Sequence, residues 1–161
     1  MNSNSHWLFK DNTIITEVPE NGNGYYAGFV YSIKDNDTGR IYIGKKNFYS
    51  TTRKPPLKGY KRKRVITKES DWRTYTSSSK IVKALIEEKG KENFTFEILA
   101  LAPDKAQLNY SELVIQVKLD VLQALNENGE RLYLNENISL RYYPSAKPET
   151  IEYRRLLNES Y

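Results

Sequence analysis

The stretch that decides the fold runs from Gly28 to Lys46 and reads GFVYSIKDNDTGRIYIGKK. Apolar and polar residues alternate on both sides of a central Asp-Asn-Asp-Thr-Gly, whose residue types favour a tight turn. Alternation with a period of two is typical of a strand that buries one face. The stretch therefore predicts a β-hairpin.

The same hairpin carries candidate functional residues. Tyr31 and Tyr42 lie on strands that can run side by side, so both phenols can point at one spot. Gly44 lets a ligand approach the backbone closely, and Lys45 and Lys46 follow it. Two phenols, a glycine and two lysines around one turn indicate a polyanion site.

Positive charge is concentrated just after the hairpin. The 161-residue chain has a net charge of +5, and residues 45–68 contain ten Lys or Arg and no Asp or Glu. Such a segment implies a phosphate-rich partner, although a solvated charge run or a localisation signal has the same composition. Pro55-Pro56 and Gly59 argue against a helix, so we expect residues 47–70 to form a long basic loop. The residues expected to bind DNA are Lys46, Lys58, Tyr60, Lys61, Arg62, Lys63 and Arg64.

The composition excludes several kinds of site. The absence of cysteine rules out disulfides and cysteine-ligated metals. The single histidine, His6, lies in a polar N-terminal segment, and we expect it to be solvated. A two-histidine metal site and a histidine-based triad are therefore unsupported. No apolar run is long enough to span a membrane, and the N-terminus lacks the pattern of a signal peptide.

The remaining pattern predicts an α/β (α+β) fold with a three-stranded mixed or antiparallel sheet flanked by helices. The expected elements are an edge strand at 13–18, a helix at 77–89, a strand at 94–101, a helix at 107–126, an extended piece at 132–134 and a last helix at 148–157. The expected organisation is an N-terminal arm at 1–24, a domain at 25–140 with a basic insertion at 47–70, and a C-terminal tail at 141–161. We expect the arm to pack on the body through Trp7 or Ile14-Ile15.

Glu112 is the carboxylate of interest, because it shares a helical face with apolar residues. One interpretation is a capping box with Asn109 as the N-cap. The other is a ligand for Mg²⁺, which one carboxylate, phosphate oxygens and waters can hold. Together, a tyrosine base, basic side chains and one metal are sufficient to hydrolyse a phosphodiester.

These residues resemble a known family. Phe29-Val30-Tyr31, followed after ten residues by Tyr42-Ile43-Gly44-Lys45, is similar to the signature of the GIY-YIG endonucleases. Further segments match in order: Ser79-Lys80, Ala84-Leu85-Ile86, Gly90, Glu92-Asn93-Phe94, Phe96-Glu97-Ile98-Leu99 and Leu108-Asn109-Tyr110-Ser111-Glu112. The resemblance covers residues 27–125, and Ser-Asp-Trp-Arg-Thr-Tyr-Thr-Ser-Ser before the helix is similar to small stand-alone phage-encoded members.

The resemblance implies cleavage of double-stranded DNA with Mg²⁺ or Mn²⁺ as cofactor. Tyr31 and Tyr42 match the two signature tyrosines, one of them a general base, and Gly44 matches the glycine of the second triplet. Lys45 matches a position that is often basic in the family, where a cation lowers the pKa of a phenol, and Glu112 matches the metal ligand. Asn137 loosely matches a family asparagine.

The match also has departures. The first triplet reads Phe-Val-Tyr, with its glycine one place earlier at Gly28. The position of the family's catalytic arginine falls beside Arg53, and three further arginines compete with it. The rivals are Arg62, Arg64 and Arg73. Tyr75, with Tyr60 as the alternative, is the expected partner of that arginine.

Three functions follow from this reading. The first is a magnesium-dependent DNA endonuclease of the host cytoplasm, a bacterial cell if the chain is phage-encoded. Such an enzyme either nicks DNA or forms a homo-oligomer to break both strands. The second is a DNA-binding protein that kept the nuclease fold without its activity. The third is an interaction factor that blocks another nuclease.

Overall fold

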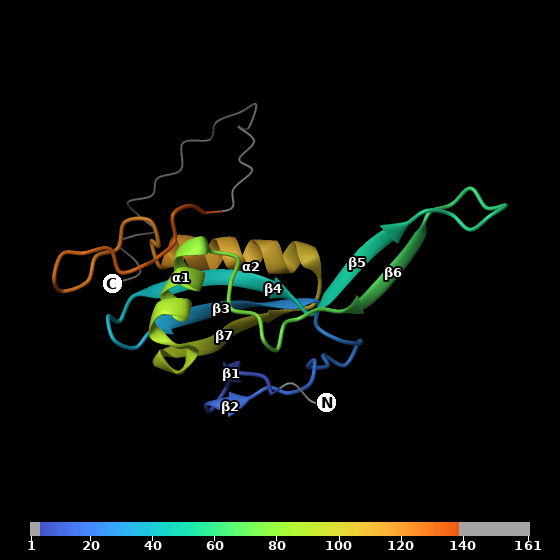
Figure 1. Ribbon diagram of the computed structural model, residues 1–161. Coiled ribbons are helices and arrows are strands. Elements are labelled where there is room, and N and C mark those ends of the chain that lie inside the picture. The colour runs from blue at the N-terminus through green and yellow to red at the C-terminus, as the bar shows by residue number, and fades with distance from the viewer. Residues whose placement is uncertain (1–3, 139–161) are drawn as a thin grey trace, which may run out of the picture.

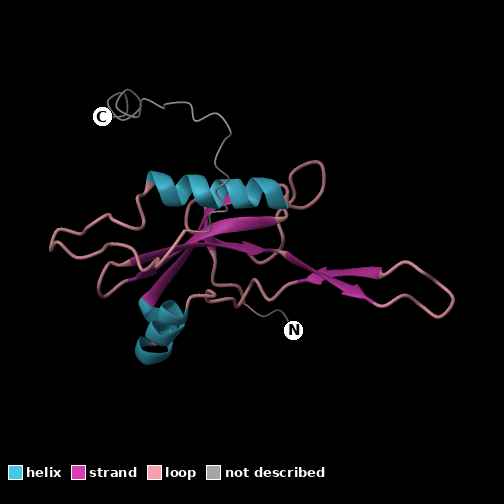
Figure 2. Cartoon of the chain, turned by 90° about the horizontal axis from the view of Figure 1, so that it is seen from above, coloured by secondary structure: helices cyan, strands magenta, loops and turns pink. Residues whose placement is uncertain are grey.

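The computed structural model describes residues 4–138, which fold into one sheet with a helix on each face and a projecting hairpin (Figure 1). The strands of the sheet lie in the order β2-β1-β7-β3-β4. Seen from above, α1 and α2 lie on opposite sides of the sheet (Figure 2). The elements are β1 Leu8–Phe9, β2 Thr13–Ile14, β3 Gly28–Asp35, β4 Ile41–Asn47, β5 Tyr49–Lys54, β6 Arg64–Glu69, α1 Lys80–Lys89, a 3₁₀ turn Lys91–Asn93, β7 Phe94–Ala102 and α2 Lys105–Lys118.

The predicted hairpin is confirmed as β3 and β4, which pair antiparallel with Tyr31 opposite Gly44. The turn is closed by Asp35, whose carboxylate accepts hydrogen bonds from the backbone of Asp37 and Thr38. Lys89 at the end of α1 donates to the same carboxylate at 2.7 Å. The hairpin turn is therefore attached directly to the helix on one face of the sheet.

Strand β7 pairs antiparallel with β3 and completes the predicted three-stranded centre. The pairing shifts by one residue, since Val30 lies opposite Ala100 while Tyr31 lies opposite Ile98. Leu99 is the extra residue of this bulge and is 38% exposed. The bulge explains why the alternation of the sequence breaks down in the apolar run after Phe96.

The expected fold class is confirmed, but residues 4–138 place five strands in the sheet rather than three. β1 pairs parallel with β7, and β2 pairs with β1. Trp7 anchors this edge: its side chain is fully buried and its indole Nε1 donates to the carbonyl of Trp72 at 2.6 Å. Of the expected anchors, Trp7 is confirmed and Ile15 is partly buried against the same core, whereas Ile14 is 51% exposed.

The expectation that His6 is solvated is wrong. The ring is half-buried, with Nε2 3.0 Å from the carbonyl of Tyr75 and its centroid 4.1 Å from that of Phe96. The anchoring of Trp7 places its neighbour against the same aromatic cluster. Burial and, to a smaller extent, the Lys91 cation lower the pKa of His6 to about 4, although the hydrogen bond to the Tyr75 carbonyl opposes both effects.

Both helices predicted for the middle of the chain are present, but their ends differ from the predicted ends. α1 follows the N-cap Ser79, whose hydroxyl accepts from the backbone of Val82, and stops at Gly90 as expected. α2 is capped by Asp104 and ends at Lys118, well before the predicted end at 126. Asp120 adopts a φ of +46° there, which breaks the helix and turns Val121 into the core. The helix expected at 148–157 lies outside the described residues.

The expectation of a basic loop at residues 47–70 is also wrong. The segment forms the antiparallel ribbon β5–β6, whose tip holds Pro55-Pro56 and Gly59 (Figure 1). The two prolines exclude a helix, but strands form on either side of the tip. Phe48 and Trp72, both fully buried, fix the base of the ribbon to the body.

Candidate active site

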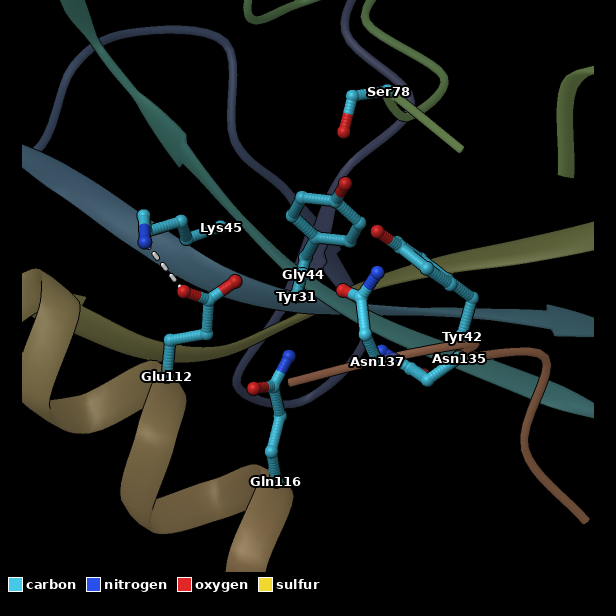
Figure 3. Close-up of a pocket in the computed structure, with 9 residues that line it drawn as sticks. All are labelled: Tyr31, Tyr42, Gly44, Lys45, Ser78, Glu112, Gln116, Asn135 and Asn137. Atoms are coloured by element: carbon cyan, nitrogen blue, oxygen red, sulfur yellow. Dashed lines mark hydrogen bonds and ion pairs between the residues drawn. The ribbon is translucent and has the colours of Figure 1, made fainter. Parts of the chain in front are cut away.

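A pocket of about 270 Å³ lies at the edge strand β4. Its walls come from the central hairpin, the residues before α1, one face of α2 and the segment that follows α2 (Figure 3). The lining residues are Tyr31, Tyr42, Gly44, Lys45, Ser78, Glu112, Gln116, Asn135 and Asn137. The sequence-predicted Tyr31, Tyr42, Gly44, Lys45, Glu112 and Asn137 are therefore brought together.

Gly44 is the point where the two tyrosines meet. A Cβ atom at this position would lie 2.6 Å from the hydroxyl oxygen of Tyr31 and 2.9 Å from Cε1 of Tyr42. The ring of Tyr31, on the central strand β3, therefore reaches the pocket only because residue 44 has no side chain. The two ring centroids are 6.2 Å apart.

The two phenols differ in their surroundings. Tyr31 is 1% exposed, and burial raises its pKa far above the usual value. Tyr42 is half-buried; burial raises its pKa as well, while hydrogen bonds from the hydroxyls of Ser77 and Ser78 oppose the shift. Burial is the largest influence on both phenols, and the effect of Lys45 on the pKa of a phenol stays a prediction.

Lys45 forms an ion pair with Glu112, with its Nζ 2.5 Å from the carboxylate oxygen. Successive side chains of a strand point to opposite faces, so Lys45 faces α2 whereas Tyr42 and Gly44 face α1. Glu112 is 8% exposed. The capping-box interpretation is excluded, because α2 begins at Lys105 and Asn109 lies inside it.

Two amides that the sequence reasoning missed complete the pocket. The side chain of Asn135 accepts a hydrogen bond from the Ile43 backbone N–H at 3.0 Å and donates to the Ile43 carbonyl at 2.8 Å. Gln116 donates to the same carbonyl at 3.3 Å. Gln116 was detectable as the residue one helical turn after Glu112, whereas no sequence signal distinguished Asn135. Ser78, which precedes α1, also lines the pocket and was not predicted as a site residue.

The donor set fits a hydrated magnesium ion. The described residues hold no group of three His, Cys, Asp or Glu, but Mg²⁺ is commonly held by one or two carboxylates together with waters and phosphate oxygens. Glu112 supplies a carboxylate. The amide oxygen of Gln116 is buried and has no hydrogen-bond partner within the described part of the chain. An oxygen in this state suits a metal-bound water.

The four candidate arginines do not reach this pocket. Arg53 is exposed on β5, and Arg62 and Arg64 lie at the tip and on β6 of the same ribbon. Arg73 contacts Glu69, Glu17 and the carbonyl of Thr16. Among residues 4–138, then, no arginine lines the pocket, and the expectation that Arg53 belongs to the site is wrong.

Lys46 occupies the position next to the tyrosines. Its Nζ lies 3.8 Å from the ring centroid of Tyr75 and 2.5 Å from the carboxylate of Asp71. Tyr75 in turn contacts Tyr31, with 6.1 Å between ring centroids. Lys46, expected only to bind DNA, is thus held beside the pocket. The other expected DNA-binding residues, Lys58, Tyr60, Lys61, Arg62, Lys63 and Arg64, are exposed on the ribbon.

A sheet with a helix on each face, and a pocket of two tyrosines, lysine and glutamate at its edge strand, define a nuclease domain of the GIY-YIG type. A family model described as "Putative endonuclease segE, GIY-YIG domain" matches residues 7–138. The chain therefore belongs to the GIY-YIG endonuclease family. No curated protein and no solved structure matches it. Within residues 4–138, every helix is too short or too polar to cross a membrane.

Proposed function

We propose that this chain is a DNA endonuclease that uses Mg²⁺ or Mn²⁺ and a tyrosine general base. The observation that carries the proposal is the pocket at β4, which gathers both tyrosines, Lys45 and Glu112. DNA binding alone requires no such combination of buried phenols and a buried carboxylate. One copy with one such pocket nicks one strand, so a double-strand break requires two copies.

Tyr42 is the better candidate for the general base. A base must reach the attacking water, and Tyr42 is more exposed than Tyr31. The serine hydroxyls near Tyr42 favour its ionised form, while Tyr31 is more deeply buried. In its ionised form, the Tyr42 phenolate accepts a proton from the attacking water, while the neutral Tyr31 phenol donates a hydrogen bond to a phosphate oxygen.

Lysines take the electrostatic role that the arginine was expected to fill. Lys45 and Lys46 flank the pocket from opposite faces of β4, because neighbouring side chains on a strand alternate. Their ammonium groups stabilise the negative charge that grows on the phosphate in the transition state. Asp71 holds Lys46 in place through its ion pair.

Glu112 and, through a water molecule, Gln116 would hold the metal ion. When bound, the ion neutralises charge on the phosphate and on the leaving oxygen. Lys45 Nζ lies 2.5 Å from the Glu112 carboxylate, so this ion pair fixes the orientation of the carboxylate toward the pocket.

The test is an incubation of supercoiled plasmid with the protein and Mg²⁺. We expect nicked DNA with Mg²⁺, none with EDTA, and none with Glu112→Gln. Glu127→Gln, an exposed glutamate after α2, is the matched control and retains cleavage. Absence of cleavage by the wild-type protein, or full cleavage by Glu112→Gln, contradicts the proposal.

The absence of arginine from the described pocket lining favours one second candidate, a DNA-binding protein without catalysis. It predicts salt-dependent DNA binding that EDTA does not change, with no nicking in the same plasmid assay. The two candidates therefore give opposite results in one experiment.

A further inference from the structure

The structure carries a second surface besides the pocket, the projecting ribbon β5–β6 (Figure 2). We propose that this ribbon enters the major groove of duplex DNA with one defined face toward the DNA. This cationic face consists of Ser50, Thr52, Lys54, Arg64, Ile66 and Lys68. The inference rests on the proposed function only in taking DNA as the substrate.

The register of the ribbon separates its two faces. Directly paired residues of an antiparallel ribbon share a face, and residues two apart along a strand do so as well. Lys54 pairs with Arg64 and Ser50 pairs with Lys68, which places three cations and no anion on one face. The opposite face carries one cation, Arg53, and one anion, Glu69.

The ribbon packs little of its surface against the rest of the domain. All residues of β6 are exposed, as are those of β5 from Thr51 onward. Val65 at 61% and Tyr60 at 72% exposure are large side chains left in solvent. An isolated two-stranded hairpin is only marginally stable in water. A segment that contributes so little to the core presents its faces to a partner outside the domain.

The charge of the ribbon identifies the partner as a polyanion. Residues 49–69 contain eight Lys or Arg and one acidic residue. None of these eight cations forms an ion pair with a residue of the described chain, and Glu69 contacts Arg73 of the body. Lys54 directly opposite Arg64 is a repulsive pair, which phosphate groups would relieve.

The shape and position of the ribbon fit a groove beside the cleavage site. The major groove admits a two-stranded β-ribbon. β5 follows β4 after the single residue Phe48, so the ribbon continues the strand that carries Gly44 and Lys45. The 6 residues of β5 span about 20 Å, which corresponds to about six base pairs. Bases read by the ribbon should thus lie within about one helical turn of the cut.

Binding is tested without cleavage, in EDTA and with Glu112→Gln as the background. The variant Lys54→Gln/Arg64→Gln/Lys68→Gln is compared with a charge-matched control, Lys34→Gln/Lys105→Gln/Lys118→Gln, whose lysines are exposed on β3 and α2. Fluorescence anisotropy with a duplex should show a loss of affinity of about 10-fold or more and a salt slope smaller by about 3 for the ribbon variant. Equal losses in both variants, or equal affinity for duplex and single strand, overturn the proposal.

Dimethyl sulfate footprinting then identifies the groove, because guanine N7 lies in the major groove and adenine N3 in the minor groove. We expect protection of guanine N7 that the ribbon variant loses. Protection of adenine N3 alone overturns the assignment to the major groove. Neither measurement requires cleavage, so an inactive wild-type protein contradicts the proposed function while the ribbon is still tested.

Discussion

At the residue scale, Gly44 controls the geometry of the candidate site. Its missing side chain lets the hydroxyl of Tyr31 pass over β4, since a Cβ would lie 2.6 Å from that oxygen. Gly44→Ala should therefore displace the phenol. We expect cleavage to fall by about 100-fold, the cost of misplacing a reacting group by about 1 Å, while overpacking lowers stability by only about 1–3 kcal/mol.

The control for this prediction is Gly39→Ala, in the turn between β3 and β4. No atom lies within 4 Å of an added Cβ there, but the φ of +73° strains any side chain, so the substitution costs stability away from the pocket. We expect lower stability in thermal unfolding and unchanged cleavage per folded molecule. Equal cleavage rates in Gly44→Ala and wild type contradict the role of Gly44.

His6 makes stability depend on pH. Its folded pKa of about 4 lies below the unfolded value of about 6.5. The unfolded chain therefore binds a proton between pH 6.5 and 4 that the folded chain excludes, and stability falls as pH falls through that window. Because the ring is partly exposed, we expect the free energy of unfolding to fall by only about 1 kcal/mol between neutral pH and about pH 5.

Urea denaturation at pH 7.5 and pH 5 measures this effect, with His6→Gln as the reference that removes the titrating ring. Between these two pH values, the free energy of unfolding should fall by about 1 kcal/mol more in the wild type than in His6→Gln. Because His6 is the single histidine of the chain, NMR of its ring reports its pKa directly. A pKa at or above 6.5 contradicts the prediction.

Much of the candidate site could be predicted from single residues of the sequence. The two tyrosines, Gly44 and Lys45 lie on one predicted hairpin, so the local pattern alone placed them together. Asn135 was missed because its role depends on a tertiary hydrogen-bond pair with Ile43. Arg53 was placed wrongly, because spacing along the chain cannot show that a ribbon carries a side chain away from the body.

At the scale of elements, Asn135 acts as a substitute partner for the outer edge of β4. Its amide reproduces the donor and acceptor pattern of a neighbouring strand against Ile43, and it is 2% exposed. Asn135→Ala leaves a buried N–H without its partner. We expect a loss of about 2–3 kcal/mol in the free energy of unfolding.

Asn128→Ala, an exposed asparagine in the turn after α2, is the matched control and should change stability by less than about 0.5 kcal/mol. Hydrogen exchange of the Ile43 amide should accelerate in Asn135→Ala alone. Unchanged exchange at Ile43 contradicts the role of Asn135 at the strand edge.

Element types were predicted better than element ends. The strands at 28–46 and 94–101 and the helix at 77–89 have clear periodicity and occur. The second helix ends at Lys118 because Asp120 takes a positive φ, a backbone feature that the apolar pattern through Leu125 conceals. The ribbon was missed because its strands bury neither face, so they lack the alternation that marks a strand.

At the scale of the whole molecule, the N-terminal segment is part of the packed body. Trp7 contacts the rings of Phe29, Tyr31 and Phe96 and is fully buried. Trp7→Ala should lower the free energy of unfolding by about 3–5 kcal/mol. Ile14→Ala, at a half-exposed position, should cost less than about 1 kcal/mol, and chemical denaturation compares the two. Similar losses contradict the anchoring role of Trp7.

The molecule therefore joins the pocket at β4 to the ribbon β5–β6 through two consecutive strands, β4 and β5. The Tyr42 assignment is the central chemical claim, and the single-turnover cleavage rate of Tyr42→Phe with Mg²⁺ tests it most directly. The substitution removes only the oxygen that accepts the proton. We predict a rate at least about 100-fold below the wild type, with duplex affinity unchanged by anisotropy. Cleavage by Tyr42→Phe at the wild-type rate would contradict the account.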